Sequence, residues 1–534
     1  MSISRRTTLA LFGSAGLAAL GGVARAAQVK GATPNAFLAA EKMAIAHFDS
    51  GASDVMPYPV ARGEFHVDLR QCAHVSGGPI NILTAASTSP NYMWAISSQG
   101  VAYVDVRGGG FKEVARLAAP GMKLITAEMH AKVMDQTFTS LEQVERAIKD
   151  DYGVDWTRIG NGVYSFVDRD NRVFYNTRNG AVFVFELIDP ANPAAGIRIA
   201  RSRDFRSMLG ERETVTGMAV TYDGRIAIVG SRSLSVIGRD LEGEPARVVF
   251  GDDERITNSI AIDERNGIYV ASDKLMRKVV WTGSKLSQDE ADGAWSSPYD
   301  GGRQPPQIKF GTGTGSTPTL MGFGPDNRLV IITDGADRMK LVAFWRDAIP
   351  ARAKPVAGAA SKRIAGQIQV TCGLNPAPEF VQSEQSVVID GYGAFVVNNI
   401  GEGKGAKDPM VGVVAIGPVL TPAKGCERFE WSPSAQAWRS NWSRPDVVST
   451  SMVPTLSGPS RVVLVNGFTA KDGWEVTGMD WKTGKTVHRT IFGPGNRGNG
   501  AYALVQLLPN GDLLFNSVDG PYRVPLRRSR GAAL

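Results

Sequence analysis

One pattern of hydrophobic and polar positions recurs along the chain. A polar or glycine-rich lead-in precedes a short apolar run, then comes a turn containing Asp, Asn or Gly, and a second β-rich run completes the unit. Residues 257–273 (TNSIAIDERNGIYVASD) and 319–334 (TLMGFGPDNRLVIITD) show it most clearly. Short apolar runs bounded by turn residues predict strands, so each unit is predicted to form a strand, a tight turn and a second strand.

The unit recurs along the whole chain. Six further copies cover residues 80–106, 162–185, 216–237, 386–416, 454–481 and 501–524. Starts separated by roughly 40 to 80 residues are typical of four-stranded blades with loops of unequal length. Closing such sheets into a ring removes exposed strand edges. The sequence therefore predicts an all-β fold, a seven- or eight-bladed β-propeller with short helical insertions. The blade count stays open because the last unit could complete the first blade.

Two segments interrupt the β pattern with signals for the start of a helix. Thr33 is placed to cap a helix that has Pro34 at its first position and runs through Met43. Ser140 and Gln143 form a capping box for a second helix, in a long insertion between the first two units. We expect both helices to pack on the propeller rim, and the second could instead cover the central channel.

The first 26 residues have the order of an export signal. Arg5 and Arg6 are followed by Leu9, by an apolar run containing glycines, and by Ala24-Arg25-Ala26, which resembles a cleavage site. The paired arginines match the twin-arginine pattern, while an ordinary Sec signal or a membrane anchor stays open as an alternative. We therefore expect a periplasmic protein without an integral membrane span.

The rest of the chain is predicted to divide into a helical or extended segment at 27–76 and the propeller at 77–530. Removing residues 1–26 lowers the formal net charge from +7 to +4. The basic residues of the C-terminal tail indicate a solvated terminus rather than a nucleic-acid-binding patch. The expected partner is a small-molecule substrate, and the oligomeric state stays open.

The sequence contains three cysteines. In an oxidising compartment, one disulfide and one spare thiol are the expected arrangement. Cys372 and Cys426 each lie beside a glycine in predicted loops, so we predict a Cys372–Cys426 disulfide and a free Cys72. The sequence has no Cys-x-x-Cys-His motif, which argues against covalently attached haem.

The commonest catalytic motifs are absent from the sequence. It has no Gly-x-Ser-x-Gly motif, and Gly484-Lys485-Thr486 lacks the first glycine of a phosphate-binding loop. The histidines are too few and too unevenly spread for an iron site built from four of them. His66, Asp68, Cys72 and His74 are closely spaced but match no tetrahedral zinc pattern.

Oxygen-bearing side chains are better placed for chemistry. The inner strand of each propeller blade starts at the mouth of the central channel, so polar residues before these strands converge there. Residues in such positions are Asn81, Thr216, Asn258, Thr317, Glu384 and Asn499, with Asp334 and Asp337 after a second strand. Calcium binds convergent oxygens of this kind, although the same residues could simply cap strand ends and orient turns. The predicted calcium ligands are Asn258, Asp334, Asp337, Glu384 and Asn499.

One unit resembles a known family. Residues 258–263 (NSIAID) and 267–273 (GIYVASD) are similar to the asparagine-led repeat of the gluconolactonase, paraoxonase and strictosidine-synthase-like calcium propellers. The resemblance implies that Asn258 binds calcium and that the ion polarises a lactone or ester carbonyl, with Glu384 or Asp334 handling protons. The predicted function is a metal-dependent hydrolase of a small organic ester or lactone.

A second resemblance lies near the other end of the chain. Residues 480–487 (DWKTGKTV) are similar to the Asp-x-x-Thr-Gly turn of the eight-bladed pyrroloquinoline-quinone propellers, which the chain also matches in overall size. A quinoprotein-type dehydrogenase is therefore one alternative function. A non-catalytic propeller that binds a protein or polysaccharide partner is the other, and it would show an exposed apolar face rather than a polar channel.

Overall fold

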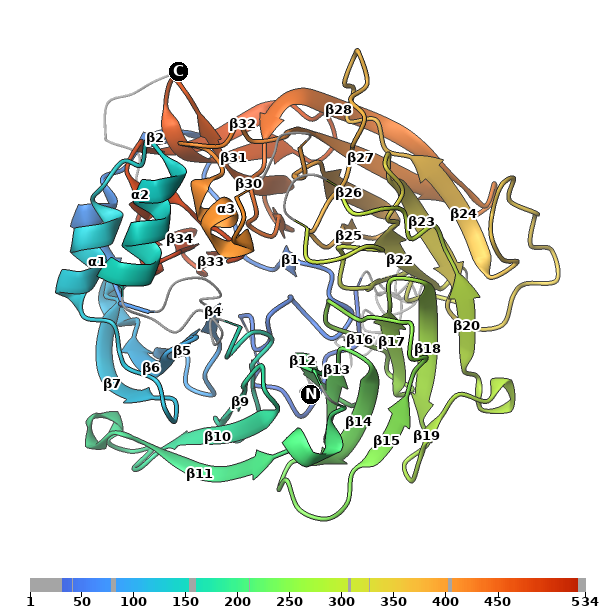
Figure 1. Ribbon diagram of the computed structural model, residues 1–534, viewed down its shortest axis with the longest axis horizontal. Coiled ribbons are helices and arrows are strands. Elements are labelled where there is room, and N and C mark those ends of the chain that lie inside the picture. Colours follow the sequence, from blue (N-terminus) through green and yellow to red (C-terminus); the bar gives the residue numbers. More distant parts are fainter. Residues whose placement is uncertain are drawn as a thin grey trace, which may run out of the picture.

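The computed structural model describes residues 31–40, 42–77, 83–152, 160–210, 212–305, 309–325, 327–401 and 406–526. The predicted export signal at 1–26 and Asn81 lie outside these residues. Eight β-sheets are arranged in a ring around a central axis (Figure 1). The prediction of an all-β propeller is confirmed, and the structure settles the blade count at eight.

The first four blades follow one another along the chain, each running outward from the axis. Blade 1 is formed by β4 (Leu83–Ala85), β5 (Tyr92–Ser97), β6 (Gly100–Asp105) and β7 (Lys112–Ala118). Blade 2 is formed by β8 (Phe166–Val167), β9 (Val173–Asn176), β10 (Ala181–Leu187) and β11 (Ile197–Asp204). Blade 3 is formed by β12 (Val215–Val220), β13 (Arg225–Gly230), β14 (Ser233–Gly238) and β15 (Ala246–Val249). Blade 4 is formed by β16 (Ala261–Ile262), β17 (Gly267–Ala271), β18 (Leu275–Trp281), β19 (Leu286–Ser287) and β20 (Trp295–Pro298).

The other four blades complete the ring, and N-terminal strands join the last two. Blade 5 is formed by β21 (Thr319–Met321), β22 (Leu329–Thr333), β23 (Lys340–Trp345) and β24 (Ile364–Gln369). Blade 6 is formed by β25 (Val388–Asp390), β26 (Gly393–Val397), β27 (Lys424–Ser432) and β28 (Ala437–Val448). Blade 7 is formed by β29 (Thr455–Ser457), β30 (Val462–Thr469), β31 (Gly473–Asp480) and β32 (Thr486–Gly493), flanked by β1 (Val55–Met56) and β2 (Gly63–His66). Blade 8 is formed by β33 (Val505–Leu507), β34 (Leu513–Ser517) and β35 (Gly520–Val524), with β3 (Ala73–His74) as its outer strand.

The turn between β16 and β17 shows why the repeated unit folds as it does. One carboxylate oxygen of Asp263 accepts hydrogen bonds from the backbone amides of Arg265 and Gly267, both at 2.9 Å. Asn266 adopts a left-handed conformation with φ of 59°, which asparagine tolerates better than most residues. The second Asp263 oxygen accepts the Tyr269 hydroxyl proton at 2.6 Å. Both carboxylate oxygens of the aspartate that follows this inner strand are therefore occupied by local hydrogen bonds.

The segment between residues 35 and 56 runs across the middle of the ring (Figure 1). It makes a hydrogen bond with the inner strand, or its immediate end, in every blade. The pairs, in order of blade, are Met43–Ala86, Ala44–Val167, Asn35–Val220, Ser50–Ile262, Gly51–Leu320, Ser53–Ile389, Asp54–Leu456 and Met56–Leu507. We call this segment the plug.

The prediction of a helix that begins at Thr33 is wrong, because the described residues of this segment form turns and isolated bridges. A helix would use its backbone groups internally, whereas here the amide of Ala39 donates to the carbonyl of Val167 at 3.0 Å. The plug therefore exchanges helical hydrogen bonds for bonds to the blades.

Helices gather over one part of the ring. They are α1 (Ala127–Met134), α2 (Leu141–Arg146), the π-helical η3 (Ala147–Asp151) and α3 (Pro409–Ala415). The short 3-10 helices are η1 (Leu69–Gln71), η2 (Arg107–Gly109), η5 (Pro193–Ala195), η6 (Arg206–Met208), η7 (Glu290–Asp292) and η8 (Asn496–Gly498). The predicted cap of α2 is confirmed, since the Ser140 hydroxyl accepts from the amide of Gln143 at 3.2 Å. In the described part of the chain, none of the helices has the length and apolar character needed to cross a membrane.

Candidate functional site

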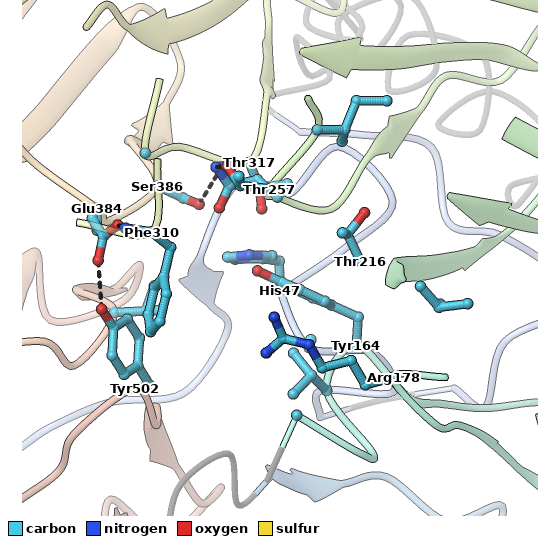
Figure 2. Close-up of a pocket in the computed structure, with 18 of the residues that line it drawn as sticks. His47, Tyr164, Arg178, Thr216, Thr257, Phe310, Thr317, Glu384, Ser386 and Tyr502 are labelled. Atoms are coloured by element: carbon cyan, nitrogen blue, oxygen red, sulfur yellow. Dashed lines mark hydrogen bonds between the residues drawn. The ribbon is translucent and has the colours of Figure 1, made fainter. Parts of the chain in front are cut away.

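A cavity of about 230 Å³ lies beside the plug (Figure 2). Its walls come from the residues that lead into inner strands of several blades, and Ala46 and His47 of the plug also line it. Among the residues that the sequence pattern selected, Thr216, Asn258, Thr317 and Glu384 line it. The plug thus forms part of the wall of this pocket.

A histidine–aspartate pair on the plug lies at this pocket. His47 Nδ1 is 2.9 Å from one Asp54 oxygen and 3.2 Å from the other, and both side chains are buried. The amide of Phe48 also donates to Asp54. An ionised Asp54 favours a proton on Nδ1, which leaves Nε2 as the basic ring nitrogen. This is the arrangement of a general base held in one orientation by a buried acid.

Several residues of the site have strained backbones. Asp54, Tyr164 and Tyr502 have φ values of 56°, 61° and 52°, in the left-handed region. For residues other than glycine this costs about 1–3 kcal/mol each, a cost that recurs at functional sites. Tyr164 stacks on the His47 ring with 6.0 Å between ring centroids. The strained position of Tyr164 thus places an aromatic face against the candidate base.

Glu384 lies on the opposite wall of the pocket (Figure 2). Its two carboxylate oxygens accept short hydrogen bonds from the amide of Phe310 and the hydroxyl of Tyr502. Burial raises the pKa of the Glu384 carboxyl, and these two hydrogen bonds offset part of the rise. The rings of Phe310 and Tyr502 are 5.2 Å apart and give this wall an aromatic surface.

The five predicted calcium ligands are not brought together at one point. Asn258 and Glu384 line the pocket, and the Asn258 side-chain amide donates to the Thr314 carbonyl at 3.1 Å. Asp334 is bound by the amide and ammonium groups of Lys340, and burial raises its pKa to about 6.

The remaining two predicted ligands have partners of their own. Asp337 forms an ion pair with Arg303, and the Asn499 side chain bonds the Val414 carbonyl and the Ala501 amide. Within the described residues, no group of three or more His, Cys, Asp or Glu side chains could hold a metal ion. These donors do not fit a calcium site, so we derive no step through a metal.

The predicted disulfide is not formed, and all three cysteines are free thiols. Cys372 packs against the backbone of Gly425, while the thiol of its expected partner Cys426 is turned toward Met479, with 3.7 Å between the sulfurs. Both thiols lie in apolar surroundings, and burial raises their pKa values well above the usual range. These two cysteines are therefore packing residues in the structure.

Sequence reasoning missed the residues that contribute most to the pocket's chemistry. His47 and Asp54 lie in a segment that was predicted only as helical or extended. The run 47–54 (HFDSGASD) carries a signal, because it combines a histidine, two aspartates and turn-forming residues. Tyr164 and Tyr502 carry no local signal, since their positions depend on contacts made by the folded ring.

Comparisons with known proteins leave the function open. No family model matches the sequence. An uncharacterised protein from Archaeoglobus fulgidus is 32% identical over 323 residues, which cover 58% of this chain and 61% of that protein. The match thus spans about three fifths of the relative.

Among solved structures, the chain is similar to a quinohemoprotein alcohol dehydrogenase from Pseudomonas putida, with a TM-score of 0.48, 11% identity and coverage of 88% of this chain and 75% of that chain. A europium-containing methanol dehydrogenase matches with a TM-score of 0.47, 10% identity and coverage of 89% and 88%. Likeness at this level says nothing about activity, and the propeller fold is established by the strand order of the chain itself.

Proposed function

We propose that this protein is an enzyme that performs general acid–base chemistry on a small organic molecule bound in the plugged channel. The observation that carries the proposal is the buried His47–Asp54 pair at the pocket. Asp54 fixes the orientation and tautomer of the imidazole, so Nε2 is the nitrogen available to take a proton.

The reaction that this arrangement serves best is hydrolysis of a small ester or lactone. Nε2 of His47 takes a proton from water, and the resulting hydroxide adds to the carbonyl carbon. When the carbon–oxygen bond breaks, the imidazolium returns the proton to the leaving alkoxide, which gives an acid and an alcohol. Glu384, whose pKa is raised by burial, is a second group that can hold a proton on the opposite wall.

The two alternatives from the sequence have less support. A binding propeller would present an apolar outer face, but the large exposed apolar side chains of the described residues are scattered, and one of them, Phe310, belongs to the pocket. A quinoprotein dehydrogenase is distinguished by its cofactor, so an absorbance spectrum of the purified protein tests it directly.

We also propose that the protein is exported by the twin-arginine route. The support is the sequence of residues 1–26, with Arg5 and Arg6 before the apolar run. Replacing both arginines by lysine keeps the charge but removes the guanidinium groups, so the precursor is expected to stay in the cytoplasm. Normal periplasmic amounts of this variant would contradict the proposal.

The test of the enzymatic proposal is a rate comparison on a panel of chromogenic esters and lactones. We expect His47→Gln to lower kcat on any accepted substrate by about 10²–10⁴-fold, because general-base catalysis contributes that much. The matched control is His66→Gln, since His66 is exposed and pairs only with the nearby Glu64. A His47→Gln variant that folds and keeps the wild-type rate would overturn the assignment.

A further inference from the structure

Two arginines line the pocket without a carboxylate partner. Arg178 follows β9, and Arg255 lies in the connection between blades 3 and 4. Neither guanidinium forms an ion pair or a side-chain hydrogen bond in the described part of the chain. The carboxylate of Asp273 accepts a hydrogen bond from the backbone amide of Arg255, not from its guanidinium. Among the described residues, these two exposed guanidinium groups at the pocket therefore have no ion-pair partner.

The two charges are close enough to affect one another. Burial lowers the pKa of Arg178, and the positive charge of Arg255 lowers it further. Both side chains are exposed at the pocket, so solvent screens their repulsion when the pocket holds no ligand. An anionic ligand between them would accept charge-assisted hydrogen bonds from both groups.

The Arg178 side chain is held in place at its base. Its backbone amide donates to the Asn161 side chain at 2.9 Å, and its carbonyl accepts from the Val215 amide at 3.0 Å. The side chain also runs along the backbone of Gly160, where an added Cβ would lie 3.3 Å from Arg178 Cδ. Because these contacts hold the backbone of Arg178, its guanidinium projects into the pocket on the side of Tyr164 (Figure 2).

The wall that faces Arg178 favours one orientation of a bound anion. Glu384 lies there with Phe310 and Tyr502, while Arg178 lies across the pocket and His47 between them (Figure 2). An anionic group is repelled by the carboxyl side and attracted to the arginines. The aromatic pair on the far wall suits an apolar part of the same molecule. His47 then faces the middle of the ligand.

From these contacts we propose that the pocket binds an organic anion, whose carboxylate or phosphate group is held by Arg178 and Arg255 and whose apolar part packs on Phe310 and Tyr502. This inference builds on the proposed function, since it names the substrate class of the same site. The cavity of about 230 Å³ limits the ligand to a small molecule, below the roughly 300 Å³ at which drug-sized sites begin.

The test is binding of small probes to the full-length mature protein, followed by calorimetry and by thermal shift. The probes are benzoate, phenyl phosphate, acetate and inorganic phosphate, with neutral benzamide as the uncharged comparison. We expect at least one anion to bind and benzamide to bind at least about tenfold more weakly, because one lost charge-assisted contact is worth that factor. Preference for the carboxylates or for the phosphates identifies the anionic group, and either result supports the proposal.

Three variants decide whether the arginines are responsible. Arg178→Gln and Arg255→Gln are each expected to weaken anion binding by about tenfold. The control Arg439→Gln makes the same charge change on an exposed position of β28 and should bind like wild type. Equal binding by all three variants, or no anion binding by the wild type at tens of millimolar, overturns the proposal.

The same assay separates this proposal from the enzymatic one. His47→Gln should abolish turnover but keep the anion affinity, because His47 is not assigned to the anion. If His47→Gln leaves turnover intact while the arginine variants lose binding, the acid–base function is wrong and the anion site stands. If His47→Gln loses turnover while the arginine variants bind normally, the anion site is wrong and the base stands.

Discussion

His488 provides a stability prediction with a definite pH window. It lies on β32, where Nδ1 is 2.7 Å from the carbonyl of Ala61 and Nε2 is 2.9 Å from the hydroxyl of Thr490. It therefore ties the N-terminal segment that follows the plug to the outer part of blade 7. Burial lowers the pKa of His488 from 6.5 to about 4. The prediction compares the free energy of unfolding at pH 7 and at pH 4.5.

The lowered pKa of His488 determines whether the fold gains or loses stability as the pH falls. The folded protein keeps His488 neutral down to a pH of about 4, whereas the unfolded chain binds a proton near pH 6.5. The unfolded state therefore gains stability as the pH falls through this window. At about 1.4 kcal/mol per pKa unit, the full shift is worth roughly 3 kcal/mol, and roughly 2 kcal/mol of it is lost between pH 7 and pH 4.5.

The assay is urea unfolding of wild type and His488→Gln at both pH values. Other groups titrate in the same window, including Asp49 and Asp334, whose pKa values are raised to about 6 and which stabilise the fold on acidification. Their contribution is common to both proteins and cancels in the difference. We expect the wild type to lose roughly 2 kcal/mol more than the variant. Equal losses would refute the reasoning, and His66→Gln, at an exposed histidine, should behave like wild type.

Three other predictions concern the pocket and the cysteines. Tyr502→Phe removes the donor to the buried Glu384 carboxyl, so we expect the free energy of unfolding to fall by about 1–3 kcal/mol and the Glu384 pKa to rise, seen as a shifted limb in a pH–rate profile. EGTA is expected to leave the melting temperature unchanged, because the five predicted calcium ligands do not converge at one point; a lower melting temperature together with bound calcium on metal analysis would restore the calcium interpretation. Thiol titration of the denatured, unreduced protein should find three free thiols, and one would restore the Cys372–Cys426 bridge.

The blades could be predicted because the information for them is local. Each unit combines an apolar strand, a turn and a second strand within about 25 residues, and the turn chemistry is carried by residues such as Asp263 and Asn266. The same holds for the cap of α2, where Ser140 and Gln143 are three positions apart. All eight predicted units correspond to the eight sheets of the ring.

The site could not be predicted to the same degree, because its residues come together only through distant contacts. The polar lead-ins were expected to converge, and Asn258 and Glu384 do line the same pocket. The plug was misread as a helix at Thr33 because Thr-Pro signals a helix start locally, while the competing hydrogen bonds come from strands far along the chain. A single sequence gives no measure of that competition.

The plug makes the pocket depend on the whole ring. Its hydrogen bonds reach all eight blades, so it can dock completely only after every inner strand is in place. His47 and Asp54 both lie on this segment, and Tyr164 and Glu384 lie just before β8 and β25, two of the inner strands that receive it. A chain that lacks one blade would therefore also lack an oriented base. The proposed active site is thus a property of the closed propeller.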